Sequence, residues 1–136
     1  MIKKQFTLYL ENKPGALASI TKKLASKKIN IDGISVSEST DVGLVQVVVD
    51  NAEATHKILA ASGVPFTEQD VALLTLKNKP GALSDVVSRL AAAKVNINYV
   101  YATGCTCTDR HCGCLAIISA PDLRAVEKAW KKVSKR

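Results

Sequence analysis

The sequence contains one six-residue segment twice: Asn-Lys-Pro-Gly-Ala-Leu occurs at residues 12–17 and again at residues 78–83. The similarity extends beyond this segment, because eleven of the twenty residues at 12–31 are identical to those at 78–97, at a constant offset of 66. A repeat of this length indicates two copies of one structural unit. We therefore expect two modules of similar fold, at residues 1–68 and 69–136.

The first copy has the pattern of a small α+β unit. Alternating apolar residues predict strands at 5–10, 30–39 and 44–50, followed by a short fourth strand at 64–67. Apolar residues at helical spacing follow the Pro-Gly pair and predict a helix to about residue 28, with a second helix at 52–61. The order β-α-β-β-α-β is typical of the ferredoxin-like fold, an antiparallel sheet with both helices on one face.

The second copy repeats this order with two differences. Its predicted elements are strands at 71–77, 95–103 and 115–120 and helices at 80–93 and 122–133. Trp130 belongs to the apolar face of the last helix and is expected in the core. No segment matches a fourth strand, so we expect the second module to lack its last strand and to leave open the edge beside its first strand. Its hairpin, at 104–114, is expected to be four residues longer.

The repeated pattern of strand, Asn-x-Pro-Gly-x-Leu, helix, Asn-Ile and strand resembles the ACT domain, a small regulatory module attached to many enzymes of amino-acid metabolism. The resemblance covers nearly the whole chain as a tandem pair. It implies a regulatory protein, which senses a free amino acid where two modules meet and acts on a partner enzyme. It also implies a homodimer or a larger homo-oligomer. The sequence shows no nucleophile–base pair, no phosphate-binding loop and no cofactor fingerprint, so we expect no catalytic residues.

The resemblance places the effector at the loop after the first strand and at the start of the second strand. Asn12 with Asn30, and Asn78 with Asn96, match the asparagines that contact the effector in serine-sensing members. A histidine of those members is replaced by leucine in both copies, which argues against serine itself. The implied ligand-binding residues are Asn12, Pro14, Gly15, Ala16, Leu17, Asn30 and Ile31 in the first copy, and Asn78, Pro80, Gly81, Ala82, Leu83, Asn96 and Ile97 in the second.

Elementary chemistry supports a site at the same loops. The loop leads into a helix amino terminus, where free N–H groups and the helix dipole favour a carboxylate. Gly15 and Gly81 lack a side chain, so a ligand can approach the backbone closely. Asparagine offers both a donor and an acceptor, as a zwitterion requires. The alternative is that Pro-Gly is only a tight turn and that the asparagine is only a local cap.

A cysteine-rich hairpin is the second chemical feature. The four cysteines of the chain are Cys105, Cys107, Cys112 and Cys114, with His111 among them. We take Ser39 to lie opposite Leu44 in the first copy and carry this pairing to the second copy, with the inserted residues shared between the two strands. Cys105 then lies opposite Cys114, and Cys107 lies opposite Cys112. Because side chains alternate along a strand, all four thiols are expected on the face away from the helices.

Four thiolates so arranged suit a tetrahedral zinc ion, with His111 as a spare ligand. The same thiolates also suit Cu(I) or an iron–sulfur cluster. Two further alternatives are redox-active disulfides and four unligated thiols. This hairpin supports a rival function, that of a metal-binding or redox-sensing protein.

Charge and hydropathy narrow the classes of partner. The net charge of +7 comes from lysine-rich helices that carry almost no aromatic residues, so we expect solvated helix faces and consider a nucleic-acid partner unlikely. No apolar run reaches the roughly 18 residues of a membrane helix. The first residues lack the apolar core of a signal peptide, and we expect a cytoplasmic protein with no membrane partner.

Overall fold

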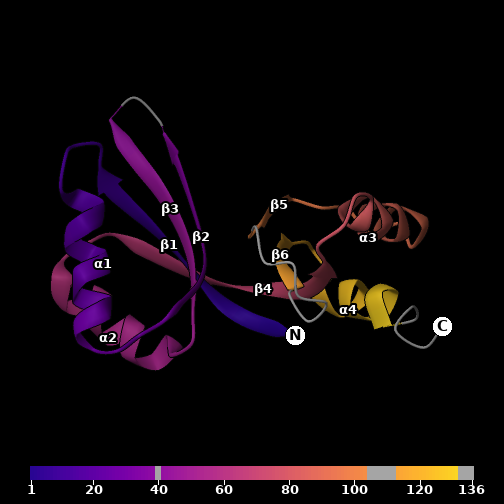
Figure 1. Cartoon of the computed structure of the whole chain (residues 1–136). Helices are drawn as coiled ribbons and strands as arrows, with labels where there is room; N and C mark the ends of the chain where they lie inside the picture. The colour runs from indigo at the N-terminus through magenta and orange to yellow at the C-terminus, as the bar shows by residue number, and fades with distance from the viewer. Residues whose placement is uncertain (39–40, 104–112, 132–136) are drawn as a thin grey trace. The chain divides into compact units, whose positions relative to one another are not determined.

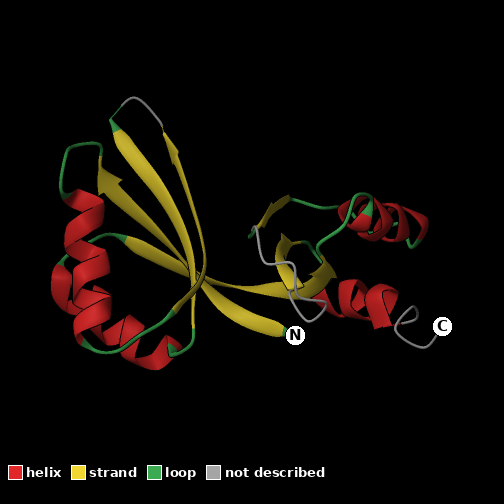
Figure 2. Ribbon diagram, viewed as in Figure 1, coloured by secondary structure: helices red, strands yellow, loops and turns green. Residues whose placement is uncertain are grey.

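The computed structural model describes residues 1–38, 41–103 and 113–131, which form ten helices and strands (Figures 1 and 2). The chain divides into two compact units. The first module is Lys4–Gln69, and the second module combines Met1–Lys3 with the described residues from Asp70 onward. Each module has the β-α-β-β-α order and the antiparallel sheet that the sequence predicts.

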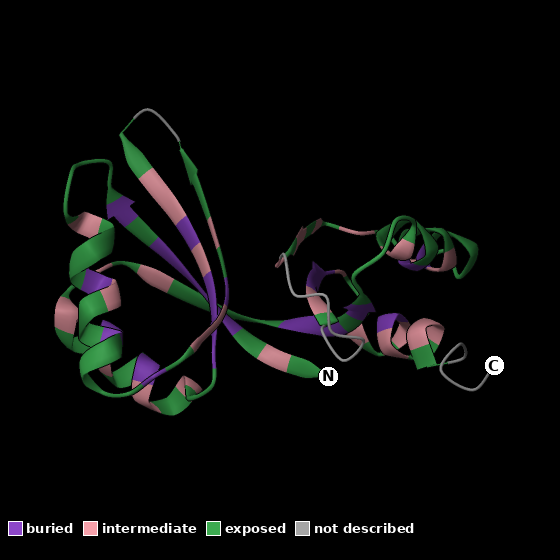
Figure 3. Cartoon of the chain, in the orientation of Figure 1, coloured by how far each residue is buried: buried purple, intermediate pink, exposed green. Residues whose placement is uncertain are grey.

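The first module contains β1 (Ile2–Glu11), α1 (Ala16–Ser26), β2 (Ile31–Glu38), β3 (Val42–Val49), α2 (Ala52–Ser62) and the start of β4 (Phe66–Lys77). Its strand order is β2-β3-β1-β4. Alternate residues of β1 and β3, such as Phe6 opposite Val47, are buried in one cluster with Leu24 and Leu59 of α1 and α2. Buried segments lie on both strands and on both helices (Figure 3). Both helices therefore cover one face of the sheet (Figure 1).

The second module contains the rest of β4, α3 (Ala82–Ala92), β5 (Tyr99–Ala102), β6 (Gly113–Ser119) and α4 (Leu123–Lys131). Its strand order is β4-β6-β5. The core again joins the helix-facing side of the sheet to the two helices: Leu74 and Ile118 pack with Leu90 of α3 and Val126 of α4. Trp130 packs against this core, as the sequence predicts.

The edge of the second sheet beside β4 is not open, and this corrects the expectation from the sequence. No fourth strand follows α4 within the described residues. Instead, Met1 lies beside β4: the Leu73 N–H donates to the Met1 carbonyl at 2.7 Å, and the Met1 amino group donates to the Leu73 carbonyl at 3.1 Å. The start of the chain thus occupies the position beside the first strand of the second module.

β4 is one continuous strand where the sequence predicts two. The predicted strands at 64–67 and 71–77 are separated by Glu68, Gln69 and Asp70, which are polar and have the composition of a linker. In the structure these residues continue the extended backbone. Their exposed side chains explain the composition, because a strand residue that faces solvent has no need of an apolar side chain.

The hairpin registers also differ from the prediction. Ser37, not Ser39, lies opposite Leu44. Glu11 pairs with Val42 in the first copy, and the equivalent pair in the second copy is Lys77 with Gly113. Equivalent residues therefore differ by 66 in number before the hairpin (11 and 77) and by 71 after it (42 and 113). The insertion is therefore five residues long, not four. A slip of two residues leaves every side chain on its own face, so alternation alone could not fix this register.

None of the helices in the described residues is long and apolar enough to cross a membrane.

Candidate functional site

The repeated Lys-Pro-Gly-Ala segment forms the same tight turn in both modules. The Ala16 N–H donates to the Lys13 carbonyl at 3.4 Å, and the equivalent bond of Ala82 to Lys79 measures 3.3 Å. Gly15 has φ 88° and ψ −13°, the conformation of the third residue of a type II turn, for which proline is favoured at the second position and glycine at the third. The sequence Pro-Gly thus dictates the turn, and it does so twice.

The turn delivers the chain directly into a helix whose amino end has no side-chain cap. Gly15 and Gly81 stand at the capping positions of α1 and α3, and neither helix has a side chain that accepts from its first turn. The helical bonds of α1 start with Ser19, whose N–H donates to the Gly15 carbonyl at 2.9 Å. The Ala16 N–H is used within the turn, so the N–H groups of Leu17 and Ala18 are the ones that point out of the helix end, as an anion site requires. The asparagines do not cap these helices.

Asn12 and Asn30 lie at opposite ends of the first sheet. Asn12 follows Glu11, which pairs with Val42, whereas Asn30 hydrogen-bonds to Asp50 beyond the other end of β3. β1 and β2 both run antiparallel to β3, so the two asparagines are separated by about eight residues of β3, from Val42 to Asp50, or about 26 Å. One effector molecule cannot contact both asparagines of the same module.

The second module repeats this separation. Asn78 directly follows Lys77, which pairs with Gly113 at the start of β6. Asn96 lies near the other end of β6, because the N–H of Asn98, two residues later, donates to the Ser119 carbonyl. All four predicted asparagines are exposed. A site that uses both types of asparagine must therefore take them from different modules.

The remaining predicted residues have mixed environments. Pro14, Gly15 and Ala16 line a pocket, and Leu17 and Leu83 are 36% and 42% exposed at the starts of α1 and α3. Pro80 and Gly81 are exposed in the second turn, and Ala82 is half-buried and packs against the second core. Ile31 and Ile97 also pack against the cores, so burial alone explains these two residues.

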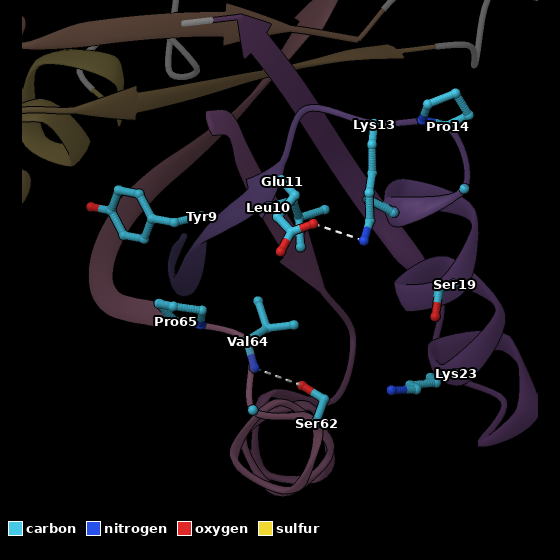
Figure 4. A pocket seen from close by; sticks show the side chains of 13 residues that line it. Tyr9, Leu10, Glu11, Lys13, Pro14, Ser19, Lys23, Ser62, Val64 and Pro65 are labelled. Carbon is cyan, nitrogen blue, oxygen red and sulfur yellow. Dashed lines mark hydrogen bonds and ion pairs between the residues drawn. The ribbon is translucent and has the colours of Figure 1, made fainter. Parts of the chain in front are cut away.

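A pocket of about 490 Å³ lies within the first module (Figure 4). Its walls come from the end of β1, the Lys13–Gly15 turn, one face of α1 and residues 62–65. Three features hold residues 62–65 in place. Gly63 ends α2 with φ 73°, and the Ser62 hydroxyl accepts from the Val64 N–H at 3.4 Å. The Tyr9 N–H of β1 donates to the Pro65 carbonyl at 3.0 Å. The volume is in the range of small-molecule sites.

Three charged side chains line this pocket, together with the hydroxyl groups of Tyr9, Ser19 and Ser62. Glu11 and Lys13 form an ion pair at 2.7 Å (Figure 4). The pKa of Glu11 is lowered and the pKa of Lys13 is raised from their ordinary values. The larger cause is the hydrogen bond between the two side chains, and the smaller cause is the attraction of their opposite charges. Ser19 and Lys23 lie one helical turn apart on the face of α1 that borders the pocket. Lys23 has no ion-pair partner within residues 1–38, 41–103 and 113–131.

Sequence reasoning missed Glu11, Lys13, Ser19 and Lys23 as site residues. The helical spacing places Lys23 on the polar side of α1, and solvated lysines are common there. The spacing of Gly15, Ser19 and Lys23 at i, i+4 and i+8 was an available signal, because it places these residues in one stripe that starts at the turn.

The structure tests one residue of the cysteine hairpin. Cys114 is half-buried, lies opposite Leu76 of β4 and packs against the helix-side core, so its predicted position on the face away from the helices is wrong. The cause is the register: Tyr101 pairs with Ile117, and this pairing differs by one residue from the predicted one. Cys105, Cys107, His111 and Cys112 lie outside the described residues, and the metal site stays a prediction. No cluster of three or more metal-ligating side chains occurs in the part of the chain that the structure describes.

Comparison with protein families and solved structures gives consistent results. The family described as ACT domain pair matches residues 1–108. Protein BT0572 from Bacteroides thetaiotaomicron is similar in structure with a TM-score of 0.86 and 27% identity, over 97% of this chain and 88% of that chain. A search of curated proteins found no match.

Regulatory subunits of aspartate kinase share the fold. The ligand-free subunit from Thermus thermophilus has a TM-score of 0.67 and 18% identity, over 96% of this chain and 91% of that chain. The subunit from Thermus flavus has a TM-score of 0.61 and 19% identity, over 96% of this chain and 95% of that chain.

Proposed function

Because this chain belongs to the family of ACT domain pairs, we propose that it is a regulatory protein that senses a free amino acid and acts on a partner enzyme of amino-acid metabolism. The observation that carries the proposal is the turn built identically in both modules, which ends in a helix amino terminus without a side-chain cap. A carboxylate of the effector accepts from the free N–H groups of that terminus. The fold shared with regulatory subunits of aspartate kinase supports a regulatory role.

The positions of the asparagines support an assembly of modules as the binding unit. Asn12 and Asn30 are too far apart in one module to share an effector, so an effector that contacts both types of asparagine bridges two modules. We propose a homodimer or a larger homo-oligomer that supplies the second module. Binding shifts the equilibrium between two arrangements of modules only to the extent that the effector prefers one of them, and the partner enzyme responds to that arrangement.

A thermal-shift screen against the twenty amino acids tests the proposal. A ligand that binds only the folded protein raises the Tm, and the shift grows with ligand concentration above the Kd. We expect a selective shift with one amino acid or with a small chemical group of them. The shift should be lost in the Asn12→Ala/Asn78→Ala double variant, while Asn98→Ala, which removes an exposed asparagine outside the turns, should keep it. The absence of any shift would contradict amino-acid sensing.

A further inference from the structure

The charges around the first-module pocket do not balance. Lys13 and Lys23 contribute two positive charges and Glu11 contributes one negative charge, so the lining carries a net charge of +1 by this sum. The amino end of α1 at Gly15 adds a further partial positive charge. A zwitterionic ligand without a side-chain charge would leave this excess uncompensated, whereas a ligand of net charge −1 would balance it.

The positive groups also occupy two different parts of the pocket. Lys13 is the first residue of the turn, and Lys23 lies eight residues after Gly15, or about 12 Å farther along the helix axis. Their flexible side chains reach into the space between these points. Two separate cationic groups suit a ligand with two carboxylates, of which one meets Lys13 and the helix amino end and the other meets Ser19 and Lys23. Glu11 pairs with Lys13 through one carboxylate oxygen, and its other oxygen can accept from an ammonium group.

The opposite wall of the pocket is largely apolar. Leu10, Val64 and Pro65 line it, and Figure 4 shows Val64 and Pro65 across the pocket from Ser19 and Lys23. An apolar wall suits the methylene groups of a small ligand and reduces the exposure of its polar contacts to water. A ligand that carries an ammonium group, two carboxylates and a short methylene chain is an acidic amino acid.

The second module has lost this combination. Arg89 stands at the position equivalent to Lys23, and Asp85 stands at the position equivalent to Ser19. The Arg89 guanidinium lies 5.6 Å from the centre of the Trp130 ring, and its Nη1 is buried without a hydrogen-bond partner among the described residues. Arg89 is thus covered by α4, and Asp85 repels a second carboxylate. The two copies of the turn are the same, but the charges that surround them differ.

We propose that the first-module pocket is a binding site selective for acidic amino acids, with Lys23 as the residue that binds the side-chain carboxylate, and that the described part of the second module, with Asp85 in place of Ser19, has no equivalent site. This inference rests on the proposed function and names the chemical class of the effector. Asparagine and glutamine match the two acidic amino acids in shape but lack the charge, so Lys23 should discriminate against them through a charge-assisted hydrogen bond.

Isothermal titration calorimetry of the full chain with L-glutamate, L-aspartate, L-glutamine and L-asparagine tests this inference. We expect an acidic amino acid to bind with one molecule per chain, and its amide analogue to bind about tenfold more weakly or not at all. Lys23→Gln should weaken acidic binding by about tenfold and remove the preference over the amide. Lys22→Gln has the same change in net charge one residue away, outside the pocket lining, and should bind like the parent protein. Arg89→Gln should also bind like the parent protein.

Three results would overturn the inference. Equal binding of acid and amide, parent-like binding by Lys23→Gln, or a stoichiometry of two acidic molecules per chain would each contradict it while leaving amino-acid sensing intact, since another class of amino acid can still be the effector. Lack of binding by all twenty amino acids would overturn the inference together with the proposed function. The two failures are therefore distinguishable.

Discussion

Replacing Gly15 with alanine should destabilise the first module, and the structure sets the size of the effect. Gly15 has φ 88°, where a side chain with a β-carbon costs about 1–2 kcal/mol. A β-carbon added there would meet no other atom within 4 Å, so the cost is backbone strain without a steric clash. Alanine also restricts the unfolded chain, which offsets about 0.4–1 kcal/mol. We expect the free energy of unfolding to fall by about 1 kcal/mol.

Gly43 is the matched control in the same module. It lies in β3 without a positive φ, and an added β-carbon would be 3.7 Å from the Leu10 carbonyl oxygen, an ordinary contact. Gly43→Ala should therefore raise the free energy of unfolding by about 0.4–1 kcal/mol, because only the effect on the unfolded chain remains. The two substitutions are chemically identical and should have opposite signs.

Urea denaturation followed by far-ultraviolet circular dichroism measures both changes, with the slope of the unfolding free energy against urea expected to stay constant. Gly81→Ala should reproduce the loss in the second module, since Gly81 has the same φ of 88°. If Gly15→Ala is as stable as the parent protein, or if Gly43→Ala is the more damaging change, the assignment of the turn geometry as the reason for the repeated glycine is wrong.

Three further changes test the fold and the site. Asn51→Ala should destabilise α2 by about 1 kcal/mol in urea denaturation, because the Asn51 side chain accepts a hydrogen bond from the first turn at 3.0 Å. Leu90→Ala should cost about 2–5 kcal/mol, since Leu90 is 1% exposed, whereas Leu83→Ala on the same helix should cost about 0.5 kcal/mol or less, and equal losses would contradict the assigned core. Lys13→Met should return the pKa of the Glu11 carboxyl upward toward its ordinary value in an NMR pH titration, because Lys13 holds it down. The lowered pKa means that this ion pair contributes stability above the ordinary carboxyl pKa and that the contribution disappears as the pH falls through the lowered value. An unchanged Glu11 titration in Lys13→Met would contradict the pair.

The sequence predicts the fold of this chain well, because its strongest signals are local. The turn at Lys13–Gly15 needs only proline and glycine in adjacent positions, and the helices that follow need only an apolar stripe. The repeat then extends each local prediction to a second copy. Phe6 and Leu8 are buried as the alternation indicates.

The register of paired strands and the contacts between distant segments could not be predicted from such local signals. The hairpin register was wrong by two residues in the first copy, and a slip of that size changes no side chain's face. In the second copy the pairing differed by one residue, so Cys114 faces the helix-side core instead of the opposite face. The contact of Met1 with Leu73 joins segments more than seventy residues apart, and no local pattern encodes it.

The candidate site shows the same division. The turn and the helix amino end follow from the repeated residues, but the pocket also requires Val64 and Pro65, which approach the turn only because β4 pairs with β1. Lys23 acquires its role from that arrangement. Asn12 and Asn30 match one family pattern, yet the parallel directions of β1 and β2 separate them. Residue spacing alone does not reveal such a separation.

The most direct test of the account is an NMR titration of the isotopically labelled chain with L-glutamate and L-aspartate, followed by mapping of the amide shifts. The account predicts saturable shifts for one of them that cluster at Gly15, Ala16, Ser19, Lys23 and Val64, with much smaller shifts at Gly81 and Arg89. Saturable shifts that cluster at the second-module turn, or no saturable shifts with either amino acid, would contradict it.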